Sequence, residues 1–493
     1  MTRPRIHGSG KPPPVPAPQL FQTILDDVLA TATMPFDDWQ KLWPDPFTAM
    51  AIPVSGSRQY QCTQAAINAA HELTQQSWDT HANLRQTIAR RVFDRLSFTA
   101  IGDAIAACPA HLPQSRRTGT VDDSFYEMMA ADYEANLQSG SAMARPDLDR
   151  HIPCQLFELS QNVPAFNVGP VAFRPRADWI AAYVTEPAVL HHVKQVERGA
   201  IAFDRFTQQA LAQGSTMDEL KAWQVLSSLH GYGWVATVRM KGHEATRSHE
   251  KASVIVGLAL DVLGLRFHLE DARLFTKTGR QHLFSEARLA TTMTGQFLKG
   301  SSVSRAGLGG PPGALTAKMR AEQPFLDDAG QVLDAYVNGR NIGKAPHLVE
   351  RWANALYWFG EARREASDFM AVVDYGCAAD GLSGAGGNAK TMTEFAEAAL
   401  NPKSAPMGAG TLSISDAISK IYREGRNKLA HGEVSGLFED QSETRAIGDN
   451  LVTLLLNELT PELAEIIVNR PQILEVPEGH AYKALVTRLK SRP

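Results

Sequence analysis

The feature that most constrains the fold is a stripe of apolar residues in the C-terminal third of the chain. From position 348 to position 373 these residues recur at steps of three and four, the spacing of one face of an α-helix. The stripe consists of Leu348, Trp352, Ala355, Leu356, Phe359, Ala366, Phe369, Met370 and Val373. A helix with one apolar face must pack against a partner, so the pattern predicts a long helix within a larger helical assembly.

Two further stripes supply the partners. One begins after Ser413, which forms a signal resembling a capping box with Asp416, and it ends at Gly432. The other precedes Thr460-Pro461, where the proline predicts the start of the next helix. Their apolar positions are Ile414, Ile418, Ile421, Gly425 and Leu429 in the first, and Ile447, Leu451, Leu454, Leu455 and Leu459 in the second. Together the three stripes predict a compact, all-α helical bundle.

The sequence before this bundle has a different pattern of prolines and apolar residues. Helical spacing runs from about residue 19, but residues 150–185 combine prolines with short apolar stretches, which favour a hairpin or a small sheet. The segment Trp234–Met240 alternates like a strand and precedes a helical pattern at Ser253–Leu265. These features predict a mixed α+β middle domain.

Shifts in composition set the expected domain boundaries. Residues 299–314 concentrate glycine, proline and serine, as flexible connections do, and the PPPVPAP run near the N-terminus favours extended chain over packing. A chain of 493 residues also exceeds one ordinary domain of roughly 100 to 200 residues. We predict a mainly α protein with a flexible tail at 1–18, a helical region at 19–148, the α+β domain at 149–298, a linker at 299–325, the helical bundle at 326–475 and a C-terminal tail at 476–493.

Charge and cysteine content exclude several classes of protein. A net charge of -4 excludes a generally basic surface that would coat nucleic acid, so any contact with RNA must be local. The 4 cysteines lie far apart and never form a CxxC pair, which argues against a disulfide framework or a zinc ribbon. No secretory signal opens the sequence, and no run approaches the roughly 18 apolar residues of a membrane span. We therefore expect a cytoplasmic protein without a membrane segment.

The second apolar stripe ends in Arg426-Asn427-Lys428-Leu429-Ala430-His431. With 15 histidines in the chain, an arginine at this distance from a histidine also arises by chance. In an α-helix, five residues separate two side chains by about 140° around the axis and about 7.5 Å along it. The pair would flank a cleft if a second copy of the helix crossed nearby, and Gly425 would permit a close approach there. A symmetric dimer would then join two arginines and two histidines.

The residue types suit RNA cleavage. RNA carries its own nucleophile, so cutting requires a base for the 2′-hydroxyl, an acid for the leaving 5′-oxygen and positive charge on the phosphate. His431 would serve as base or acid, Arg426 would fork onto two phosphate oxygens, and Asn427 would orient the phosphate or the histidine. The local basic patch that would bind RNA consists of Lys420, Arg423 and Lys428. The alternative is a solvated helix end whose histidine caps the last carbonyls.

The full amino-acid sequence of the segment is a more specific signal than the spacing of Arg426 and His431. IYREGRNKLAHG, residues 421–432, closely resembles the signature of HEPN domains, particularly the Apea-like branch, in which a helix ends in RNKxxHG. The resemblance covers about residues 340–470, including a short helix near 390–400. It implies a dimerising helical bundle with a composite site between protomers, and metal-independent endoribonuclease activity on tRNA or mRNA in toxin or antiviral-defence (abortive-infection) systems. It places Arg426, Asn427 and His431 at the catalytic positions.

The resemblance also implies a supporting acid. Members of the family often carry an acidic residue, usually glutamate, late in the long helix. Asp380 is the nearest match here, although its side chain is shorter, and Asp374 is a second candidate. The alternative reading of either residue is an ordinary acid on a helix surface.

Two other signals do not predict a metal or a cofactor. The stretch Gly384–Thr391 is glycine-rich and ends in Lys-Thr, but it lacks the glycine directly before the lysine and the preceding strand of a phosphate-binding loop. A loop between helices is favoured. His243 and His249 are six residues apart rather than at the spacing of one helical face, which favours a solvated turn. We expect neither a metal nor a cofactor.

The leading hypothesis is a regulated HEPN-type endoribonuclease. Its first two-thirds would recognise a protein or phage-derived trigger, select RNA or restrain the activity, and its bundle would form a homodimer. A second hypothesis is a noncatalytic HEPN module for dimerisation or RNA binding. A third places an enzyme site in the middle α+β domain, where residues 150–300 contain no convincing nucleophile, metal or cofactor motif.

Overall fold

The computed structural model describes residues 13–43, 50–56, 58–108, 123–279, 285–304, 307–339, 342–400, 412–431 and 440–492. The protein is mainly helical with a small sheet region, as the sequence predicts. Contacts within the chain divide it into two units, of which the first combines Met1–Leu148 with Met240–Lys251 and the second combines Asp149–Arg239 with Ala252–Pro493.

The first unit is built mainly from helices around one apolar core. Three hydroxyl groups bond to one another inside that core, because the Ser97 hydroxyl lies 2.7 Å from that of Thr74 and 2.9 Å from that of Tyr133. Gly102 lets a short hairpin pack tightly, since a Cβ there would collide with the Pro53 carbonyl. The elements are α1 (Ala17–Ala32), α2 (Phe36–Leu42), β1 (Ala51–Val54), β2 (Arg58–Gln61), α3 (Gln64–Thr80), α4 (Ala82–Thr87), α5 (Arg90–Ala107) and α6 (Asp123–Met143).

The segment Met240–Lys251 completes the first unit from far along the sequence. The Glu244 backbone N–H donates to the Thr87 carbonyl at 2.8 Å, and the Glu244 carboxylate accepts from the backbone N–H groups of Thr246 and Arg247. Glu244 therefore caps the start of helix α11 (Ala245–Gly264) while it is buried in this unit.

A five-stranded sheet forms the base of the second unit, in the order β4-β5-β6-β3-β7. The predicted hairpin at 150–185 is β4 with β5, and the predicted strand at 234–240 is β6, which pairs antiparallel with β5 so that Phe173 faces Ala236. The strands are β3 (Leu148–Gln155), β4 (Phe166–Val168), β5 (Val171–Pro175), β6 (Trp234–Met240) and β7 (Thr276–Lys277). This sheet is the small sheet region of a mainly helical protein.

Four helices are inserted between β5 and β6 and have an apolar core of their own. They are α7 (Arg176–Tyr183), α8 (Pro187–Glu197), α9 (Phe203–Ala210) and α10 (Met217–Leu229). Helix α10 starts with a complete capping box between Thr216 and Glu219. Where the insertion meets the sheet, the Trp179 indole N–H donates to His151 Nδ1 at 3.0 Å.

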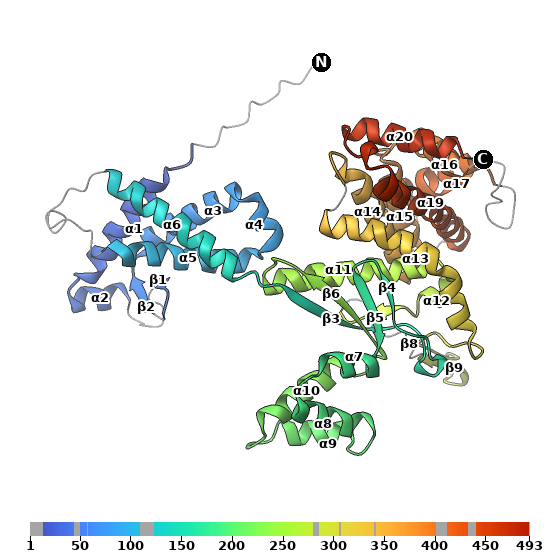
Figure 1. Ribbon diagram of the computed structural model, residues 1–493, viewed down its shortest axis with the longest axis horizontal. Helices are drawn as coiled ribbons and strands as arrows, with labels where there is room; N and C mark the ends of the chain where they lie inside the picture. The colour runs from blue at the N-terminus through green and yellow to red at the C-terminus, as the bar shows by residue number, and fades with distance from the viewer. Residues whose placement is uncertain are drawn as a thin grey trace. The chain divides into compact units, whose positions relative to one another are not determined.

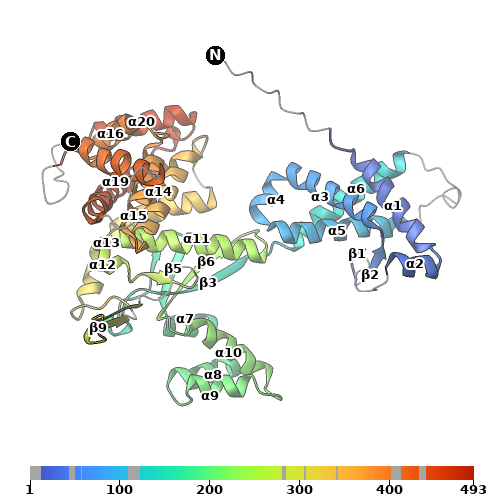
Figure 2. The same cartoon turned by 180° about the vertical axis from the view of Figure 1, so that it is seen from behind.

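Helix α11 lies between this sheet and the C-terminal bundle (Figures 1 and 2). On the sheet side, a Cβ at Gly257 would stand 3.5 Å from Lys277 Cε of β7. On the bundle side, Asp261 forms a buried ion pair with Arg364, and Gly360 makes room for the Asp261 carboxylate. Helix α12 (Leu269–Ala272) and a separate hairpin, β8 (Ser285–Thr291) with β9 (Phe297–Ser304), complete this part.

The C-terminal bundle contains the helices that the apolar stripes predict. Trp352 is fully buried and donates its indole N–H to Thr460 Oγ1 at 2.9 Å, which ties two of the helices together. The helices are α13 (Ala314–Asn338), α14 (Pro346–Arg364), α15 (Asp368–Ser383), α16 (Ala389–Leu400), α17 (Ile414–Ile418), η5 (Ser419–Asn427), α18 (Lys428–His431), α19 (Ser442–Asn469) and α20 (Glu478–Lys490). The short helix expected near 390–400 is thus α16.

Three details of the predicted bundle are wrong. The stripe from 348 to 373 belongs to two helices, because Ser367 accepts from the Met370 N–H and caps the start of α15. Pro461 lies inside α19 rather than at its start. The predicted tail at 476–493 contains α20, whose residues Ala481, Leu485 and Leu489 are buried at the helical spacing of four.

The predicted linker at 299–325 is also mostly regular structure. It includes the end of β9 and the first turns of α13, which Gly313 precedes with a left-handed conformation, φ 78°. Pro311 and Pro312 therefore mark the approach to a helix start rather than a loose connection.

Candidate functional site

The predicted catalytic segment lies at the end of one continuous helical run. It starts at α17, where the Ser413 side chain accepts from the Asp416 N–H at 3.1 Å, so the expected cap is present. The middle of the run, η5, is a π-helix of 9 residues and not the α-helix that the apolar spacing predicts. Such segments, with hydrogen bonds to the fifth residue back, are rare and occur frequently at functional sites.

Arg426 packs against helix α15 within the same chain. A Cβ at Gly376 would lie 2.6 Å from Arg426 Cβ, so only glycine allows this approach. The guanidinium donates from Nη1 to Asn427 Oδ1 at 3.0 Å, and its central carbon stands 5.3 Å from the centre of the Tyr422 ring. Burial raises the pKa of Cys377, and the hydrogen bond and positive charge of Arg426 oppose that rise.

Gly425 makes a close approach to a helix of its own chain. It is buried, and a Cβ there would stand 2.5 Å from Val372 Cγ1 of α15. Within one chain, Gly425 therefore permits the close packing of η5 against α15.

A shallow polar cavity of about 360 Å³ opens beside these residues. Its walls come from the π-helix and from the glycine-rich loop before α16, where Asn388 Oδ1 accepts from the Lys390 and Thr391 N–H groups at 3.0 and 3.2 Å. The lining residues are Gly386, Gly387, Asn388, Ala389, Tyr422, Arg423 and Asn427. Asn427 is thus in the wall, and it accepts a hydrogen bond from Arg426.

The structure gives Asp380 a definite role. Its Oδ1 accepts from the Gly387 N–H at 2.9 Å, so Asp380 fastens the glycine-rich loop to α15. Its negative charge adds to the effect of burial in raising the pKa of Tyr422. Asp374, the second candidate acid, is 8% exposed on the same helix, and its charge raises the pKa of Cys377.

The three basic residues proposed for RNA binding differ in their surroundings. Lys420 forms an ion pair with Glu443, at 3.0 Å, on the neighbouring helix α19. Lys428 is exposed. Arg423 lines both the cavity above and an adjoining one of about 570 Å³, so it is the one of the three that the structure brings to these hollows.

His431 is the last residue of α18, but its side chain lies outside the described part of the structure. For the predicted pair of Arg426 and His431, the described structure therefore gives only that His431 follows Arg426 by five residues in the same helical run.

Sequence reasoning missed two contributors to this site, Tyr422 and the glycine-rich loop. The loop resembled a poor phosphate-binding motif and was interpreted as a connection between helices. Tyr422 stands four residues before Arg426, a spacing that brings side chains together on a helix, and this signal could have found it.

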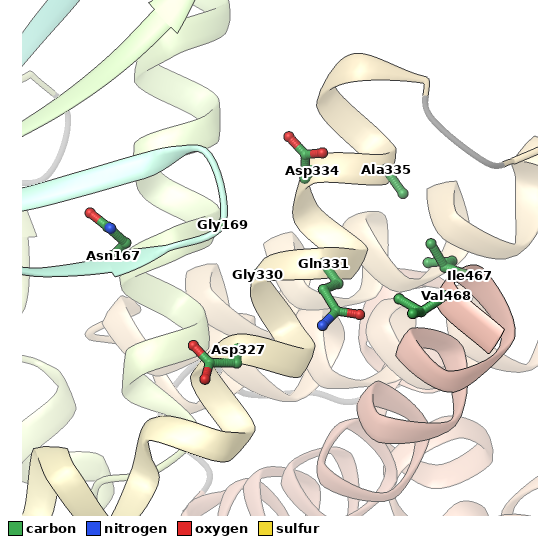
Figure 3. Close-up of a pocket in the computed structure, with 9 residues that line it drawn as sticks. All are labelled: Asn167, Gly169, Asp327, Gly330, Gln331, Asp334, Ala335, Ile467 and Val468. Atoms are coloured by element: carbon green, nitrogen blue, oxygen red, sulfur yellow. The ribbon is translucent and has the colours of Figure 1, made fainter.

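Other hollows in the second unit have a different chemistry. One of them, of about 630 Å³, lies where Gly169, in the turn of the β4–β5 hairpin, meets Gly330 of α13. Figure 3 shows the residues that line it. The carboxylates of Asp327 and Asp334 line it, which disfavours an anionic ligand such as a phosphate. Among the residues that the structure describes, no group of three or more histidine, cysteine or acidic side chains is arranged to hold a metal ion.

Within the described ranges, no helix has both the length and the apolar character needed to cross a membrane. No family model, curated protein or solved structure matches the chain.

Proposed function

We propose that the protein is a metal-independent endoribonuclease of HEPN type. The observation that carries this proposal is the arrangement at the end of the helical run, where Arg426 and Asn427 are hydrogen-bonded to each other beside a polar cavity. His431 follows on the next turn, in a sequence that resembles the HEPN signature.

The surroundings suit a phosphate. The cavity contains the Arg423 side chain and lies at the start of α16, where the helix dipole favours negative charge. Asn427 uses its carbonyl oxygen on Arg426, which leaves its amide nitrogen to donate to a ligand. Two arginines, an amide and a helix start therefore stand together on an otherwise acidic protein.

The reaction is an internal transfer within RNA. A histidine takes the proton of the 2′-hydroxyl, the 2′-oxygen forms a bond to phosphorus, and the bond from phosphorus to the 5′-oxygen breaks. A second histidine gives a proton to the leaving 5′-oxygen. Arg426 stabilises the charge on the phosphate oxygens. The products are a 2′,3′-cyclic phosphate and a free 5′-hydroxyl.

The need for two histidines is the reason to propose a homodimer through the bundle. His431 occurs once per chain at this site, while base and acid act on opposite sides of the phosphorus. We propose that the partner's His431 supplies the second. The remainder of the chain, which far exceeds a minimal bundle, would restrain or direct the activity.

The deciding experiment is an RNA cleavage assay in excess EDTA with the purified full chain. Arg426→Ala and His431→Ala should each lower the rate by at least about a hundredfold, because each removes charge stabilisation or proton transfer in the transition state. Arg470→Ala and His480→Ala, on exposed positions of the same bundle, are the matched controls and should cut like the parent.

The parent should leave 2′,3′-cyclic phosphate ends. Equal cutting by the parent and both site variants would refute the site, and cutting that requires a metal would refute the mechanism. A parent that binds RNA through Arg426 without cutting it would favour the noncatalytic HEPN module.

A further inference from the structure

The Tyr422 side chain packs against Arg426. It precedes Arg426 by four residues in the π-helix, and the residue is only 3% exposed. The guanidinium lies over that ring, with 5.3 Å between the central carbon and the ring centre, and Nη1 stands 3.4 Å from the Tyr422 hydroxyl. The same Nη1 donates to Asn427 Oδ1, so both the tyrosine and the amide contact the guanidinium.

We propose that Tyr422 is a positioning residue that fixes the Arg426 guanidinium for phosphate binding, and that the glycine-rich loop holds Tyr422 in place. This inference rests on the proposed function, because it concerns the same arginine. The guanidinium is planar and stacks on aromatic rings, which reduces the freedom that it would lose on binding a phosphate.

The loop contacts the tyrosine at its hydroxyl end. Gly387 has φ +91°, a conformation that favours glycine, and a Cβ there would stand 3.2 Å from the Tyr422 oxygen. The Gly387 backbone N–H donates a hydrogen bond to Asp380 Oδ1 at 2.9 Å. The ring is therefore enclosed by the bundle at one end and by a fastened loop at the other.

The hydroxyl remains protonated in this setting. Burial, the Asp380 charge and Cys377 raise the pKa of Tyr422, against the opposing effect of Arg426. A phenolate would form an ion pair with Arg426 and compete with the phosphate. A neutral ring supports the guanidinium without neutralising it.

The first test measures the contact without RNA. Phenylglyoxal labels arginines according to their accessibility, and peptide mass spectrometry gives the ratio of labelling at Arg426 to that at exposed Arg423 in the same molecule. Tyr422→Leu should raise this ratio severalfold, because the ring no longer covers the guanidinium. Tyr422→Phe keeps the ring and should leave the ratio near that of the parent.

The second test measures the consequence for cleavage. Tyr422→Leu should lower kcat about tenfold or more, while Tyr422→Phe stays within about threefold of the parent. In the Arg426→Ala background, Tyr422→Leu should cause no further loss, because its effect passes through the arginine. Thermal unfolding checks that each variant is folded, and Tyr422→Met replaces Tyr422→Leu if the latter does not fold.

The outcomes separate the two proposals. An unchanged labelling ratio in the leucine or methionine variant overturns the positioning role, whatever the RNA assay gives. Equal losses in the presence and absence of Arg426 also overturn it, since they would mean a structural defect. If the parent cuts no RNA but the labelling ratio still rises when Tyr422 is substituted, the proposed ribonuclease function is refuted. The contact between Tyr422 and Arg426 is then still supported.

Discussion

At the scale of single residues, glycines decide how closely the site is packed. Three of them, Gly376, Gly387 and Gly425, stand where a Cβ would meet Arg426, Tyr422 or Val372. The residue types at the candidate site could be predicted from the sequence, because the motif names them. Their partners could not be predicted, since contacts from α15 and from the loop depend on how separate helices pack.

Replacing Gly376 by alanine should loosen the site. The new methyl group would stand 2.6 Å from Arg426 Cβ, so α15 and η5 must move apart, at a cost of about 1 to 3 kcal/mol. Urea denaturation should show this loss, and RNA cleavage should fall with it. Gly381→Ala in the same helix is the control, because its Cβ would meet nothing within 4 Å. Equal stability of both variants would contradict the packing described here.

At the scale of elements, helical periodicity predicted which segments pack but not where each helix ends. The split between α14 and α15 lies at Ser367, whose side chain accepts from the Met370 N–H, and α19 continues through Pro461. The π-helix could not be predicted, because the apolar residues of this segment recur at the spacing of an α-helix. Helix α20 was missed although its apolar spacing is regular.

The junction of the sheet with the inserted helices should be sensitive to acid. Burial lowers the pKa of His151 from 6.5, and the Trp179 N–H on Nδ1 requires that nitrogen to be unprotonated. The unfolded chain therefore binds more protons below pH 6.5, and stability should fall as the pH decreases from 7.5 to 5. His151→Gln should flatten this dependence in thermal unfolding, whereas His191→Gln, at an exposed position, should not. A parallel pH profile in both variants would contradict this assignment.

At the scale of the whole molecule, buried polar contacts join the bundle to helix α11 and the turn after it within the second unit. Arg363, 6% exposed in its side chain, is held by Asp449 on α19 and donates to the carbonyls of Gly264 and Phe267. Asp449 also accepts from the Tyr375 hydroxyl at 2.8 Å. Tyr375 directly precedes Gly376, so the residues that fasten the bundle and those that pack the site are adjacent on α15.

Removing Asp449 should destabilise the second unit strongly. Asp449→Ala leaves Arg363 buried without its carboxylate, a loss of roughly 3 kcal/mol or more in chemical denaturation. Asp449→Asn keeps the shape and should cost less. Glu465→Ala, which removes an exposed ion pair with Arg470, should change stability little. A small effect of Asp449→Ala would mean that the contacts of Arg363 with Asp449 do not hold the bundle against helix α11.

The return of the chain to the first unit at Met240–Lys251 bears on the order of synthesis. A nascent chain that has reached residue 148 lacks Glu244, whose backbone N–H bonds to Thr87. Before that contact forms, the ribosome must also produce four of the five strands of the second unit's sheet and the inserted helices. The first unit is thus finished only after much of the second has emerged, and any nuclease activity of the still later bundle appears last.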